Sequence, residues 1–116
     1  MHMKGVTIGT NGAIVLHNGT DNKVVTIDDI MTIQVLVNDT VAVARGRGES
    51  SSFMSSPMEA RKMAVKVILS MGEYVIETMP QNALNTSYKR EDGTYIANYE
   101  FAKKIVETLA ALLKPM

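Results

Sequence analysis

Residues 45–52 combine the residue types that bind a phosphate group. They read Arg-Gly-Arg-Gly-Glu-Ser-Ser-Ser and lie between the last predicted strand and the first predicted helix. Guanidinium groups hold phosphate oxygens through paired hydrogen bonds, glycines let the backbone approach a ligand closely, and a helix start supplies free N–H groups. The alternative is a solvated connection anchored by Phe53. The predicted ligand-binding residues of this loop are Arg45, Arg47, Ser50, Ser51 and Ser52.

A second basic segment, Tyr88-Lys89-Arg90, is followed by Tyr95 and Tyr99. Cations beside aromatic rings can hold a phosphate and stack on a base. The alternative is that these rings are buried and leave only their hydroxyls in water. If both basic segments lie at one end of the sheet, they form a single cleft for a phosphorylated ligand.

The sequence holds few groups that could catalyse a reaction. It has no cysteine, which excludes a thiol nucleophile and zinc sites built on thiolates, and its two histidines are His2 and His17. The serines of the 45–52 loop have no plausible histidine partner, and the carboxylates fall in predicted turns or on solvent faces. We therefore predict a protein that is not an enzyme and needs no metal or cofactor.

Length and charge bound the function further. A chain of 116 residues has room for one domain, and 12 basic against 12 acidic residues give a net charge of zero. A neutral chain is not expected to coat nucleic acid or a membrane surface by bulk electrostatics. No apolar run approaches the roughly 20 residues of a membrane span, so we expect a cytoplasmic protein.

The first 47 residues alternate with a period of two, which predicts an antiparallel sheet of about five strands. Asn11-Gly12 is typical of a type I′ hairpin turn, and Asn38-Asp39 closes a second hairpin. Connections this short predict that sequential strands pair as a meander. The expected strands cover residues 6–10, 13–16, 23–27, 30–37 and 40–45.

The second half changes period and predicts a helix over residues 57–79. Ser56, Pro57 and Glu59 fit an N-cap, a first helical position and a capping box, and apolar residues then recur three and four apart. Gly72 leaves an alternative open, because it could end the helix and let residues 73–77 form a strand.

Residues 81–97 are polar and predict a loop or a small hairpin turned at Asp92-Gly93. A last helix is expected over residues 98–113, with Asn98 as its N-cap. The predicted fold is one α+β domain in which two helices pack on one face of the sheet.

Two helices on one face leave the other face uncovered. The predicted strand 30–37 carries apolar residues on both of its sides. An exposed apolar face favours association, so we expect a homo-oligomer formed through the sheet.

The order of elements, a sheet followed by two helices with loops rich in Arg, Asn and Tyr, resembles the phage anti-Thoeris sponges. The resemblance implies a phage protein that sequesters a cyclic or otherwise phosphorylated nucleotide signal, and it transfers no site residue. Two other functions stay open: a single-stranded nucleic-acid binder that uses the strands as a platform, and a phage-type inhibitor that binds a host protein.

Overall fold

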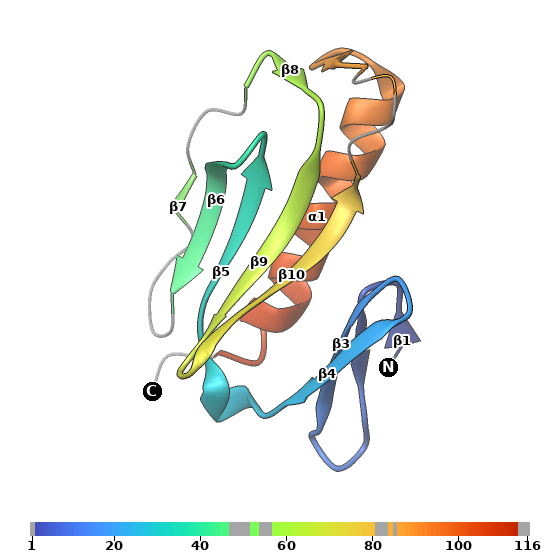
Figure 1. Ribbon diagram of the computed structural model, residues 1–116. Helices are drawn as coiled ribbons and strands as arrows, with labels where there is room; N and C mark the ends of the chain where they lie inside the picture. Colours follow the sequence, from blue (N-terminus) through green and yellow to red (C-terminus); the bar gives the residue numbers. More distant parts are fainter. Residues whose placement is uncertain (1, 47–51, 54–56, 81–83, 85, 114–116) are drawn as a thin grey trace.

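The described residues form two large antiparallel sheets, a small two-stranded ribbon and one long helix, an α+β arrangement (Figure 1). The computed structural model describes residues 2–46, 52–53, 57–80, 84 and 86–113. The α+β class predicted from the sequence is therefore confirmed. The number of sheets and the number of helices among the described residues differ from the prediction.

The first sheet has the strand order β1-β2-β3-β4. Its strands are β1 (His2–Met3), β2 (Val6–Ile8), β3 (Ile14–Asn18) and β4 (Asp21–Val25). The predicted hairpin around Asn11-Gly12 is confirmed, because Ile8 pairs with Ile14. The type I′ turn predicted there is wrong. The connection spans residues 9–13, and of the Asn11-Gly12 pair only Gly12 has a positive φ, of 85°.

The second sheet has the strand order β10-β9-β5-β6-β7, and a separate two-residue ribbon pairs β8 with β11. Its strands are β5 (Ile30–Val37), β6 (Thr40–Gly46), β7 (Ser52–Phe53), β9 (Met63–Leu69) and β10 (Gly72–Met79). The ribbon consists of β8 (Glu59–Ala60) and β11 (Tyr88–Lys89). The helix α1 (Gly93–Ala110) lies across one face of this second sheet (Figure 1).

The predicted five-stranded meander is divided by a short 3-10 helix, η1 (Ile27–Asp29). The Asp29 carboxylate accepts hydrogen bonds from the backbone N–H and the hydroxyl of Thr26, at 3.0 and 3.1 Å. This local turn redirects the chain after β4. As a result β5 does not pair with β4 but lies between β6 and β9.

The predicted helix over residues 57–79 is wrong, because this segment forms β8, β9 and β10. Along β9 the side chains of Met63, Val65, Val67 and Leu69 are buried, and the residues between them are half-buried. Ser56 lies outside the described residues, while Pro57 and Met58 are not helical. The apolar residues fit both periods, and pairing with β5 favours the extended form that β-branched residues prefer.

The alternative reading of Gly72 is confirmed. Leu69 pairs with Gly72 across the two-residue turn of Ser70 and Met71. Gly72 has a φ of 119°, which residues with a β-carbon rarely adopt. The chain therefore reverses at this point and returns as β10.

The predicted second helix is confirmed over most of its length, but its start lies earlier. Asp92 is the N-cap, and its carboxylate accepts a hydrogen bond from Thr94 N at 2.8 Å. The hairpin turn predicted at Asp92-Gly93 is wrong, and so is the N-cap at Asn98. The Asn98 side chain instead donates to Thr94 O inside the helix, at 2.7 Å.

One hydrophobic cluster joins the helix to both sheets. The buried helix residues Ile105 and Leu109 belong to the same cluster as Val35 of the second sheet and Leu16 of the first. Gly5 shows how tight the junction is, because a β-carbon there would lie 3.2 Å from Ile105 Cδ1 and 3.3 Å from Ile76 Cγ2. The first sheet therefore packs against α1 and β10 through a close backbone approach (Figure 1).

Polar contacts also join the first sheet to β10. The Tyr74 hydroxyl donates to Asp21 O and to Asp21 Oδ2, at 3.1 and 2.9 Å, and Glu77 N donates to Asn18 Oδ1 at 3.1 Å. Burial and the hydrogen bond with Asp21 raise the pKa of Tyr74 above its ordinary value. The neutral phenol is thus part of the contact between the sheets.

The turn of Asn38 and Asp39 fixes a corner of the second sheet. Both residues have positive φ, 52° and 67°, as a type I′ turn requires, so the predicted hairpin is confirmed. The Asn38 side chain donates to Glu59 O at 2.8 Å and accepts from Arg61 N at 2.7 Å. Its backbone N–H donates to Lys62 O at 3.1 Å. One turn residue therefore holds the bend between β8 and β9.

We expect Asn38→Ala to lower the free energy of unfolding by about 2 kcal/mol, because it removes two hydrogen bonds and strains a positive φ. Asn38→Gly keeps the backbone unstrained and should cost about half as much. Urea denaturation of both variants measures the difference. Equal stability of the alanine variant and the wild type would contradict this role for Asn38.

The contact of Tyr74 predicts a dependence of stability on high pH. A pKa raised in the folded state means that stability is complete below about pH 10 and falls as the pH rises through the folded pKa. Denaturation midpoints should therefore fall more steeply above pH 10 in the wild type than in Tyr74→Phe. Identical profiles for the two proteins would count against the contact.

Candidate functional site

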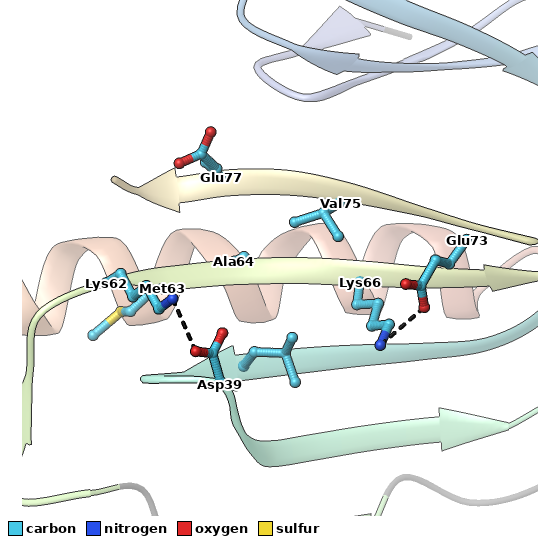
Figure 2. Close-up of a pocket in the computed structure, with 9 residues that line it drawn as sticks. Asp39, Lys62, Met63, Ala64, Lys66, Glu73, Val75 and Glu77 are labelled. Atoms are coloured by element: carbon cyan, nitrogen blue, oxygen red, sulfur yellow. Dashed lines mark ion pairs between the residues drawn. The ribbon is translucent and has the colours of Figure 1, made fainter. Parts of the chain in front are cut away.

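The face of the second sheet that is turned away from α1 carries an open groove (Figure 2). Its volume is about 300 Å³. Of the residues that the structure describes, none covers this face as α1 covers the other one. The groove is lined by Leu36, Asp39, Lys62, Met63, Ala64, Lys66, Glu73, Val75 and Glu77.

Strand alternation and register explain the composition of the groove. Val35 and Val37 of β5 are fully buried on the helix side, so Leu36 between them lies on the open face. Leu36 pairs with Ala64 of β9, which in turn pairs with Glu77 of β10. Leu36 and Ala64 therefore lie side by side on the open face, with Glu77 next to Ala64.

Two ion pairs border the apolar part of the groove, as Figure 2 shows. Lys62 Nζ lies 2.8 Å from Asp39 Oδ2, and Lys66 Nζ lies 2.9 Å from Glu73 Oε2. These pairs are exposed to solvent, so they contribute little to stability. Their lysines can lay aliphatic stems along the apolar surface.

The predicted phosphate loop is described only in part. Arg45 lies in β6, is half-buried and pairs with Ile33 of β5. Ser52 belongs to β7, where its backbone pairs with Ala44. Arg47, Ser50 and Ser51 lie outside the described residues.

The second basic segment forms a short ribbon rather than a loop. Tyr88 and Lys89 make up β11, and Arg90 N donates to Met58 O at 2.8 Å. A groove of about 330 Å³ lies along this ribbon. It is lined by Met58, Glu59, Lys89, Arg90 and Glu91, so two carboxylates accompany the two cations.

The structure does not bring Arg45 and the Lys89 ribbon together. The Asn38 turn contacts Glu59 of β8, and Glu59 pairs with Lys89. Arg45 lies five residues along β6 from Thr40 beside that turn, a distance of about 17 Å in a strand. The condition for a single cleft, that both basic segments lie at one end of the sheet, is therefore not met by Arg45 and Lys89.

The rings of Tyr95 and Tyr99 belong to the core, as the alternative prediction held, but their hydroxyls do not lie in water as it also held. They are 2% and 9% exposed, and their ring centroids are 6.0 Å apart. The Tyr95 hydroxyl donates to Pro57 O at 2.7 Å. The Tyr99 hydroxyl is buried without a hydrogen-bond partner, and burial raises its pKa above the ordinary value. Neither ring is free to stack on a base.

The side chain of His17 has a structural environment. His17 Nδ1 contacts Asn22 Oδ1, and Nε2 lies 2.8 Å from the Thr7 hydroxyl, so the ring links three strands of the first sheet. No group of three or more His, Cys, Asp or Glu side chains within the described ranges is arranged to hold a metal ion. No helix there is long and apolar enough to cross a membrane.

Sequence reasoning missed the groove residues of β9 and β10, because that segment was predicted to be a helix. The signal that could have found them is the alternation of Met63, Val65, Val67 and Leu69. Comparisons with protein-family models, curated proteins and solved structures give no match. The candidate site is therefore argued from its geometry alone.

The two buried tyrosines form a matched pair for a stability experiment. Tyr95→Phe leaves Pro57 O without its donor and should cost about 1 kcal/mol, whereas Tyr99→Phe removes a buried hydroxyl without a partner and should stabilise by up to about 1 kcal/mol. Thermal or urea unfolding of both variants tests this. A larger loss for Tyr99→Phe than for Tyr95→Phe would contradict the assignment.

Proposed function

We propose that this chain is a non-catalytic binding protein that works as a homodimer joined through the open face of its five-stranded sheet. The observation that carries the proposal is the groove over Leu36, Ala64 and Val75, on a face that no described element covers. Burial of an exposed apolar sheet face is the usual driving force for association. A second copy of the chain offers the same face at the same concentration.

The size of the face supports a stable interface. Four strands of seven or eight residues, β5, β6, β9 and β10, make up the face. At about 4.8 Å between strands and 3.4 Å per residue, they cover roughly 450 Å² in projection. Side-chain relief adds to the accessible area, which brings the face toward the roughly 800 Å² per partner of a standard interface.

The charges on the face also permit self-association. Lys62 and Lys66 are each paired with a carboxylate, so the groove carries three acidic and two basic groups, Glu77 being the additional acid. Two nearly neutral faces repel each other little. A strongly basic or acidic face would instead favour a partner of opposite charge.

A phosphorylated ligand remains a second candidate, supported by the neighbouring cations Lys89 and Arg90 at one groove. Glu59 and Glu91 line the same groove and oppose an anion. The likeness to phage anti-Thoeris sponges, and with it a cyclic nucleotide signal, stays a proposal that depends on this second groove. A nucleic-acid platform is disfavoured, since no aromatic side chain lines the groove on the open face.

The dimer is tested by light scattering at micromolar concentration. Val75 is 38% exposed on the open face, and Val75→Lys should convert the dimer to a monomer while the fold is retained. Ile96 is 49% exposed on the helix, and Ile96→Lys serves as the matched control that stays dimeric. A monomeric wild type, or equal loss of the dimer in both variants, would overturn the proposal.

A further inference from the structure

The outer edge of β4 presents unpaired backbone groups. His17 N donates to Gly5 O at 2.8 Å, so the backbone groups of His17 point away from β4. His17 is the register partner of Asn22, and N–H and C=O groups alternate sides along a strand. The groups of Asn22 and Val24 therefore point away from β3. β4 is the last strand of its sheet, and within the described ranges no strand pairs with this edge.

A groove of about 180 Å³ runs along this same edge. One side of the groove is formed by three consecutive residues of β4, Lys23, Val24 and Val25. Because the side chains of consecutive strand residues point to opposite faces of the sheet, the groove follows the backbone edge of β4 rather than one face of the sheet. The other side is formed by the turn between β9 and β10, including Met71. Val24 is 70% exposed and Met71 is 94% exposed.

We propose that the β4 edge binds an extended peptide segment of another protein, which adds to the first sheet as a strand. Its backbone pairs with the open groups of Asn22 and Val24. One apolar side chain enters the groove between Val24 and Met71. Strand addition of this kind obtains affinity from main-chain hydrogen bonds and specificity from pockets for alternate side chains.

The charges of β4 argue against a second copy as the occupant. When two β4 strands pair antiparallel, the open backbone groups of Asn22 and Val24 of both copies form hydrogen bonds with each other only in the register that places Asn22 opposite Val24. That register sets Lys23 directly opposite Lys23 of the other copy, and like charges in this position are destabilising. The face proposed for the homodimer lies on the other sheet, so the two surfaces are separate.

The probe is a fluorescein-labelled heptapeptide of alternating threonine and valine, measured by fluorescence anisotropy with the full chain. The controls are two versions of the same peptide, one with N-methyl groups on its odd residues and one with N-methyl groups on its even residues. One of these two versions loses the N–H groups that would pair with β4. The unmodified peptide should bind below about 1 mM, and the blocked version should bind at least about tenfold more weakly. No binding of the unmodified peptide, or equal binding of all versions, overturns the proposal.

Two variants of the chain locate the site. Val24→Pro removes the outward N–H, which the β3 ladder does not use, together with the valine side chain that borders the groove, and should weaken peptide binding at least about tenfold. Met71→Asp lies at an exposed turn position outside β4. It should weaken peptide binding without changing the stability of β4. Val75→Lys is the control on the other sheet and should leave peptide binding unchanged even where it abolishes the dimer.

Comparing peptide binding with oligomeric mass separates the β4 edge from the open face. Peptide binding lost equally in Val75→Lys and Met71→Asp would place the peptide on the open face and overturn the proposal. If the Val24→Pro variant has a lower oligomeric mass than the wild type, β4 pairs with a second copy of the chain. That result also overturns the proposal. A monomeric wild type that binds the peptide would remove the homodimer and keep the β4 site.

Discussion

One helix has to cover apolar residues from two sheets, and the rest of the structure depends on this constraint. The buried side of α1 packs on β5, β9 and β10, and its Ile105 belongs to the same buried cluster as Leu16 of the first sheet. A β-carbon at Gly5 would lie 3.2 and 3.3 Å from two side chains, and the φ of 93° at Gly5 is one that residues with a β-carbon rarely adopt, so this position favours glycine. Because the helix is used on one side of the second sheet, the opposite face of that sheet is left open.

The bend between β8 and β9 is held by polar contacts rather than by the core. The Asn38 amide group donates to Glu59 O and accepts from Arg61 N, so it ties the turn to both sides of the bend. An asparagine can do this because it tolerates positive φ and carries both a donor and an acceptor. The ribbon of β8 and β11, with its small groove, is attached to the sheet at this corner.

The two proposed surfaces differ in the physics of binding. The open face of the second sheet offers apolar area with paired charges at its border, which suits a broad interface between folded proteins. The edge of β4 offers backbone hydrogen bonds and a narrow groove, which suits a single extended segment. The helix packs on the second sheet and shares one buried cluster with both sheets, so each surface is supported by the same core.

The sequence by itself determined the features that depend on local conformation. It indicated five of the six strands within residues 2–46, the hairpin at Asn38-Asp39, the reversal possible at Gly72 and the α+β class, because turn residues and β-branched runs act over a few neighbours. Only the tertiary structure decided the rest. Apolar residues in 63–79 recur three and four apart as well as at every second position, and the pairing of β9 with β5, some thirty residues away, selects the strand. The same long-range pairing separates Arg45 from Lys89, buries Tyr95 and Tyr99, and assembles the open groove from three strands, which no local pattern can specify.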